Sequence, residues 1–215
     1  MSHPDVLAIT DPSLSDDVLA AKVSDVLRNV PRSSVGVQLR DKVRGSRALH
    51  VLAARLVALC REFAAPFYVN DRLDVAIAVG ADGVHLGGAS LDVADARQLL
   101  GPSAFVSVAA HELAEVERAS LVGASAAIVS PIFETPGKGP ARGTALLSAA
   151  RACAGGVRIY ALGGIDASRV APCIAAGADG VAVVRALWNA ADPARAAFEL
   201  VAAVRNRAST TGSVL

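Results

Sequence analysis

Short apolar runs alternate with longer amphipathic stretches along nearly the whole chain. The short runs are apolar on both faces, which is typical of parallel strands buried between two layers. We expect strands at Val6–Thr10, Val35–Leu39, Phe67–Val69, Gly83–Leu86, Ala104–Val108, Ala126–Val129, Arg158–Leu162 and Gly180–Val184. We expect helices at Asp16–Asn29, Ser46–Phe63, Arg72–Val79, Asp92–Leu100, Glu112–Val122, Thr144–Cys153, Ala167–Ala176 and Pro193–Arg205.

A short glycine-containing motif recurs at three of the expected helix-to-strand junctions. Gly80, Gly123 and Gly177 each stand where a helix should end and a strand should begin. Eight strand–helix units in succession favour a (β/α)₈ TIM barrel, which we expect as one domain over residues 1–206. A doubly wound open sheet is the competing architecture, because alternation does not by itself require closure. Residues 207–215 are small and polar and are expected to form a disordered tail.

The amino-acid composition limits the kinds of molecule that we expect this protein to bind. The 215 residues are 53% apolar and 19% charged with a formal net charge of +1, so nothing in the overall charge attracts nucleic acid or an anionic membrane. The apolar runs fall short of a membrane span, and we expect a cytoplasmic protein with small-molecule partners. Three widely spaced cysteines favour buried free thiols over a metal or catalytic role. The oligomeric state is not fixed by the sequence, and a homodimer stays open.

Polar residues gather where the predicted strands end, which is the face of a barrel that carries chemistry. Gln38 and Arg40 alternate in strand fashion and should project the same way, with Lys42 just beyond them. Two cations and an amide suit an oxyanion such as phosphate or diphosphate. Solvated charges at a strand end are the simpler alternative.

Asn70 and Asp71 follow the third predicted strand and directly precede a helix. Asp71 is either a helix N-cap, the commonest role of Asp at such a position, or a ligand of Mg²⁺. The nearby cations Arg40 and Lys42 make a metal–diphosphate site a reasonable alternative. His85 and His111 also stand at strand ends, and hydrogen-bonded structural histidines are favoured over acid–base roles.

The last polar elements are a long loop and a glycine pair. The segment from Ser130 to Gly143 is the longest irregular stretch after a strand, and its Thr135, Lys138 and Arg142 offer donors to an anion. Gly163-Gly164 is a tight turn that either approaches a phosphate or simply joins a strand to a helix.

Taken in order, these motifs resemble the thiamine phosphate synthase family and the thiazole tautomerases of the same superfamily. The resemblance runs from about Val6 to Trp188 and is carried by Gln38–Lys42, Asn70–Asp74, Gly80–Gly87, Pro131–Lys138, Leu162–Ile165 and Gly177–Val184. It implies a TIM-barrel transferase that couples hydroxymethylpyrimidine diphosphate with thiazole phosphate, giving thiamine phosphate and diphosphate.

The resemblance also implies roles for single residues. Arg40, Lys42, Asn70, Asp71 and Lys138 match the diphosphate and Mg²⁺ positions of the family. Gln38 matches a contact to the pyrimidine, and Thr135 matches a residue of the binding loop. Gly164, Val184 and Arg185 match the pocket for the thiazole phosphate. Arg40, Lys42 and Lys138 are therefore the expected catalytic residues and Asp71 the expected metal ligand.

Several positions depart from that pattern. Ser90 stands where the family has the second carboxylate ligand of Mg²⁺, so the metal site is expected to be altered. Ala109 replaces a serine, Gly137 replaces a threonine, and Arg185 replaces a phosphate-contacting serine. Asp92 lies close to Ser90 in sequence but is not expected to substitute for the missing carboxylate. These losses keep two alternatives open, namely a metal-independent thiazole tautomerase and a non-catalytic paralogue that binds thiamine or thiazole phosphate.

Overall fold

The computed structural model describes residues 3–137 and 139–206. Eight parallel strands close into a barrel in which each strand pairs with the next in sequence, and β1 pairs with β8. The strands are β1 (Val6–Ile9), β2 (Val35–Leu39), β3 (Phe67–Asn70), β4 (Gly83–Leu86), β5 (Phe105–Ala110), β6 (Ala126–Val129), β7 (Arg158–Leu162) and β8 (Gly180–Val183). The closed order confirms the TIM barrel and excludes the open sheet.

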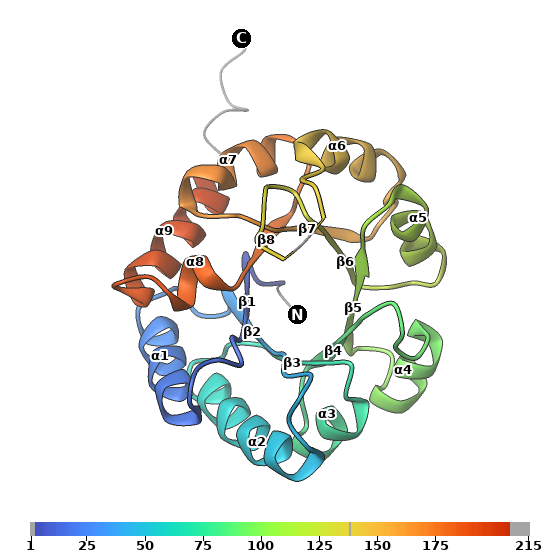
Figure 1. The fold of residues 1–215 in the computed structure, drawn as a ribbon. Helices are drawn as coiled ribbons and strands as arrows, with labels where there is room; N and C mark the ends of the chain where they lie inside the picture. The colour runs from blue at the N-terminus through green and yellow to red at the C-terminus, as the bar shows by residue number, and fades with distance from the viewer. Residues whose placement is uncertain (1–2, 138, 207–215) are drawn as a thin grey trace.

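Helices surround the barrel on the outside (Figure 1). They are α1 (Asp16–Arg28), α2 (Ser46–Glu62), α3 (Leu73–Val79), α4 (Val93–Leu100), α5 (Leu113–Leu121), α6 (Gly143–Cys153), α7 (Ala167–Ala175), α8 (Arg185–Trp188) and α9 (Pro193–Arg205). Eight of these were expected within one or two residues at each end. The short helix α8 was not expected. The expected tail at 207–215 lies outside the described residues.

The amphipathic pattern of each helix decides which of its faces meets the barrel. In α2 the buried side chains are Leu49, Leu52, Ala53, Leu56, Val57 and Cys60, which recur at the spacing of a single helical face. Gly80 closes α3 in the left-handed conformation with φ of 64°, as the repeated glycine pattern predicts. Of the three cysteines, Cys60 and Cys173 are buried free thiols, whereas Cys153 is only half-buried.

Alternation within each strand divides the core into two layers. In β1, Val6 and Ala8 pack outward against the helices, while Leu7 and Ile9 face the barrel interior. The interior is filled in its lower part by Tyr68, Phe105, Ile128, Tyr160 and their neighbours. Because the interior is packed below, the open space lies at the carboxyl ends of the strands.

No helix within the described ranges combines the length and the apolarity that a membrane crossing requires.

Candidate active site

Three polar side chains face inward at the upper ends of neighbouring strands. Gln38, Asn70 and His85 occupy inward positions of β2, β3 and β4, and Asn70 is the register partner of His85. Gln38 is only 1% exposed, and its Nε2 donates a hydrogen bond of 3.2 Å to Oδ1 of Asn70. Gln38 thus faces the barrel interior, and the pair forms a buried polar floor beneath the mouth of the barrel.

Asp71 follows this floor in an unusual backbone conformation. Its φ is 60°, in the left-handed region that only Gly, Asn and Asp adopt at modest cost. Arg72, and not Asp71, occupies the N-cap position of α3, and no side chain caps that helix. The N-cap role considered for Asp71 is therefore wrong, because its carboxylate accepts hydrogen bonds from Gly87 and Ser90 in the next loop and makes no cap bond to α3.

The Asp71 carboxylate joins the loops after β3 and β4. Its Oδ2 accepts a hydrogen bond of 2.6 Å from Nδ2 of Asn70. Its Oδ1 accepts one of 2.9 Å from the backbone N–H of Gly87 and another from the hydroxyl of Ser90. Both carboxylate oxygens are thus oriented by neutral donors, and each has lone-pair capacity beyond these bonds.

Burial opposes ionisation of Asp71, but the hydrogen bonds from Ser90 and Gly87 outweigh it and hold its pKa below the ordinary value. The positive charge of Lys42 acts in the same direction. Lys42 is exposed, so its charge reaches Asp71 through space and not by a direct contact. The carboxylate is therefore ionised at neutral pH.

A magnesium ion needs oxygen ligands, and Asp71 supplies an ionised and oriented carboxylate for one. Within the described residues, no group of three or more His, Cys, Asp or Glu side chains gathers around a common point. Asp92 does not add a second carboxylate, because it is exposed and pairs at 3.3 Å with Arg118. The donor set fits an ion held by one carboxylate and completed by substrate oxygens and water, and it does not fit an all-protein cage.

Both histidines at the strand ends are hydrogen-bonded, as expected. Nδ1 of His85 lies 3.0 Å from the hydroxyl of Ser107 on β5, and burial lowers the pKa of His85 to about 4. The imidazole is therefore neutral at physiological pH. Nδ1 of His111 lies 2.9 Å from the carbonyl oxygen of Ser130.

A cavity of about 330 Å³ opens at the mouth of the barrel. Its wall includes Arg40 from the end of β2, Thr135 from the loop before α6, the turn Gly163-Gly164, and Arg185 at the start of α8. Thr10 and Asp11 at the end of β1 also line it. The barrel thus brings residues from five distant parts of the sequence to one space.

The glycine pair is required by close packing. Gly163 and Gly164 have φ of 109° and 62°. A Cβ atom on Gly164 would lie 2.6 Å from the carbonyl oxygen of Glu134, and one on Gly163 would lie 3.0 Å from Cα of Pro131. The turn therefore does two things, because it lines the cavity and also lets the loop from Ser130 to Gly143 approach β7.

Two residues hold this side of the cavity in place. Nη1 of Arg169 donates a hydrogen bond of 2.6 Å to the carbonyl oxygen of Gly164, and its guanidinium carbon lies 5.0 Å from the centre of the Phe133 ring. On α8, Nε1 of the buried Trp188 donates a hydrogen bond of 2.6 Å to the carbonyl oxygen of Ile9. The α8 segment, whose apolar Leu187 and Trp188 are buried, thereby carries Arg185 to the cavity.

Comparisons with known proteins agree with this geometry. The family model described as thiamine monophosphate synthase matches residues 6–187. The chain belongs to the thiamine monophosphate synthase family. A thiamine-phosphate synthase from Methanoculleus marisnigri is 44% identical over 76% of this chain and 79% of its own length. Another, from Thiobacillus denitrificans, is 38% identical over 91% of this chain and 92% of its own. The solved thiamine phosphate pyrophosphorylase of Pyrococcus furiosus superposes with a TM-score of 0.84 at 28% identity, covering 95% of this chain and 96% of that one.

Three of the four positions at which the resemblance marks a departure line cavities at the mouth, and the fourth, Gly137, lines neither of them. Ser90 and Ala109 line a second cavity of about 190 Å³ between the loops of β4 and the end of β5. Arg185 lines the larger cavity on the opposite side of the mouth. Lys138 lies outside the described residues, so its expected role stays a prediction. The partly buried Val184 lies at the N-cap position of α8 and lines the larger cavity with Arg185.

Sequence reasoning missed two supports of the site. The hydroxyl of Thr10 accepts a hydrogen bond of 2.9 Å from the backbone N–H of Arg40, which fixes the point where β2 ends. Ser107 contacts His85 from the next strand. A threonine at the end of β1 and a serine at an inward position of β5 were the only signals available in the sequence.

Proposed function

We propose that this chain is a thiamine-phosphate synthase that couples hydroxymethylpyrimidine diphosphate with thiazole phosphate. One observation carries the proposal. Arg40, which the family resemblance assigns to the diphosphate, lines the same cavity as Gly164 and Arg185, which it assigns to the thiazole phosphate. Two phosphorylated substrates bound in these places would have their reactive ends in one space, and holding two reactants together removes much of the entropic barrier.

In the proposed reaction, the bond between the pyrimidine methylene carbon and the diphosphate oxygen breaks, and its electron pair leaves with the diphosphate. The ring nitrogen of the thiazole then supplies the electron pair for the new carbon–nitrogen bond. Arg40 and Lys42 stabilise the negative charge that grows on the leaving diphosphate. Gln38 contacts the pyrimidine from the floor of the mouth, and Asn70, which is hydrogen-bonded to Gln38 and to Asp71, lies on the diphosphate and metal side.

Magnesium belongs to the proposal as a partner of the diphosphate. Asp71 would hold it, and the ion would supply positive charge to the leaving oxygens. The altered second ligand position at Ser90 implies a metal bound chiefly with the substrate and not before it. Ser90 orients Asp71 through its hydroxyl in place of a second carboxylate.

The test is to incubate the purified protein with both substrates and Mg²⁺ and to measure thiamine phosphate and diphosphate. Replacing Arg40→Ala or Lys138→Ala should lower the rate by about 10²–10³-fold, the loss typical of removing one transition-state donor. Wild-type rates in both variants would contradict the assignment of these cations. If wild type forms no thiamine phosphate, supplying the thiazole carboxylate tautomer alone separates a tautomerase from a binding protein.

The expected cytoplasmic location and the homodimer stay predictions. Gel filtration of the full chain measures the second directly.

A further inference from the structure

The loop between β2 and α2 carries both cations of the proposed diphosphate site, Arg40 and Lys42, and the residue between them is Asp41. Asp41 does not face the cavity. Its Oδ1 accepts hydrogen bonds of 2.9 Å from the backbone N–H groups of both Val43 and Arg44. Such an aspartate turn fixes the backbone that immediately follows it. The direction in which Lys42 leaves the chain is therefore set by the side chain of its neighbour.

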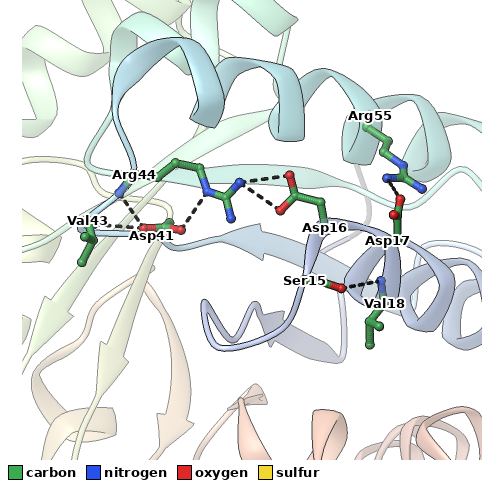
Figure 2. Close-up of polar contacts among 8 residues, drawn as sticks. All are labelled: Ser15, Asp16, Asp17, Val18, Asp41, Val43, Arg44 and Arg55. Atoms are coloured by element: carbon green, nitrogen blue, oxygen red, sulfur yellow. Dashed lines mark hydrogen bonds and ion pairs between the residues drawn. The ribbon is translucent and has the colours of Figure 1, made fainter.

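Arg44 then ties this turn to a different part of the barrel. Its Nε donates to Oδ2 of Asp41 at 3.1 Å. Its Nη1 lies 2.9 Å from Oδ1 and 3.0 Å from Oδ2 of Asp16, in the first turn of α1. Figure 2 shows the guanidinium of Arg44 between the two carboxylates, with Ser15 capping α1 beside Asp16. We call Asp16, Asp41 and Arg44 the loop clamp.

The loop clamp is partly withdrawn from solvent. The side chain of Asp41 is 8% exposed and that of Arg44 is 24% exposed. Burial opposes ionisation of Asp41, but its hydrogen bonds from Val43 and Arg44 keep its pKa below the ordinary value. The hydrogen bond to Asp41 raises the pKa of Arg44. Both partners are charged at neutral pH, in a setting where an ion pair is screened less than at an open surface.

A second pair on the same face makes a natural comparison. Nη1 of Arg55 on α2 lies 2.6 Å from Oδ1 of Asp17 on α1 (Figure 2). This pair also joins α1 to α2, but it touches no residue of the loop, and its side chains are 47% and 89% exposed. Exposed pairs of this kind contribute little to stability. The two arginines therefore differ in whether they hold the loop.

We propose that Arg44 is a positioning residue for the diphosphate substrate, because the loop clamp fixes the loop that presents Arg40 and Lys42. The inference rests on the function proposed above. Arg44 does not serve as a third cation for the diphosphate, since two of its nitrogens already donate to carboxylates. A loop held before binding loses less conformational entropy when the substrate arrives. Thr10 holds one end of the loop through the Arg40 backbone, and the loop clamp holds the other.

The experiment compares Arg44→Met with Arg55→Met in the full-length protein. The readouts are the KM for each of the two substrates, the inhibition constant of inorganic diphosphate with Mg²⁺, and the urea midpoint of unfolding. Arg44→Met should raise the pyrimidine KM and the diphosphate inhibition constant by about 10- to 100-fold, as expected when catalytic groups are misplaced by an ångström or so. The KM for thiazole phosphate and every parameter of Arg55→Met should stay within twofold of wild type.

Two further variants separate positioning from general loss of structure. Asp16→Glu keeps the carboxylate and should retain most of the diphosphate affinity. Asp16→Asn should weaken it, and adding Arg44→Met to Asp16→Asn should cost less than the two single effects combined, because both act through one clamp.

The outcomes are separable. An unchanged diphosphate inhibition constant in Arg44→Met, or an equal change in Arg55→Met, overturns the role of the loop clamp while leaving the proposed function intact. A parallel rise in both substrate KM values would mean a general disturbance and would also overturn it. A wild-type protein that neither couples the substrates nor binds diphosphate contradicts the proposed function itself, and the inference falls with it.

Discussion

The hydroxyl of Ser90 donates a hydrogen bond to Oδ1 of Asp71, and this contact joins the loop after β4 to the loop after β3. The family resemblance leads us to expect a carboxylate at the position of Ser90. In this chain the neutral hydroxyl of Ser90 donates to the carboxylate of Asp71. The negative charge of this cluster therefore comes from Asp71.

Asp71→Asn should lower the coupling rate by about 100-fold or more at fixed Mg²⁺, since an amide cannot supply the negative charge that holds the metal–diphosphate complex. The rate of thiamine phosphate formation measures this. Asp92→Asn is the matched control, because Asp92 is exposed and pairs with Arg118 outside the cluster. A similar loss in both variants would remove Asp71 from its special role.

Ser90→Asp should lower the Mg²⁺ concentration that gives half-maximal activity, because a second carboxylate would then face the ion beside Asp71. In the metal-free protein the same change should raise the pKa of Asp71, since two like charges disfavour joint ionisation. Titration of the coupling rate with Mg²⁺ measures the first effect. Ser90→Asn, which has the same shape without the charge, should not show it, and identical curves for the two variants would refute the charge argument.

Gly164→Ala should disturb the thiazole side of the cavity. The new Cβ atom would lie 2.6 Å from the carbonyl oxygen of Glu134, at a residue whose φ of 62° already disfavours alanine. We expect a loss of about 1–3 kcal/mol in the free energy of unfolding and a raised KM for thiazole phosphate. Gly156→Ala is the control, because no atom lies within 4 Å of the position of its Cβ. If Gly156→Ala behaved like Gly164→Ala, close packing at the turn would not explain the effect.

His85→Gln should flatten the acid side of the stability profile. The folded-state pKa of His85 is about 4, against 6.5 when unperturbed. Between these values the unfolded chain binds a proton that the folded chain does not, so folding stability rises with pH through this window and is lost as pH falls. From pH 7.5 to 5 wild type should lose about 2 kcal/mol more than His85→Gln, at about 1.4 kcal/mol per unit. Urea unfolding at the two pH values measures the difference, and equal losses would contradict it.

Much of the barrel follows from local patterns. The inward direction of Gln38 comes from strict alternation along β2, and the glycine at the end of α3 follows from the need for a left-handed residue there. These features depend on a few neighbouring residues. Every described strand and all the longer described helices could therefore be predicted from the sequence.

The details of the site depend on contacts between units. The Asp71 carboxylate is held by hydrogen bonds from Gly87 and Ser90, sixteen and nineteen residues later. Arg44 reaches Asp16 across 28 residues. The helix α8 is only four residues long, too short for its periodicity to be read. These contacts form only when the barrel closes and brings distant segments together. A local sequence pattern therefore does not predict them.

Backbone hydrogen bonds hold both ends of the loop before α6: its first end is bonded to the end of β7, and its last residues are bonded back to its first. The N–H groups of Ile132 and Phe133 donate to the carbonyl oxygens of Leu162 and Gly163, and those of Arg142 and Gly143 donate to Pro131 and Ile132. The chain therefore leaves and rejoins the barrel at one anchored point. Because these bonds use backbone groups alone, we expect side-chain changes between the two ends to leave the anchor and the register of the eight strands in place.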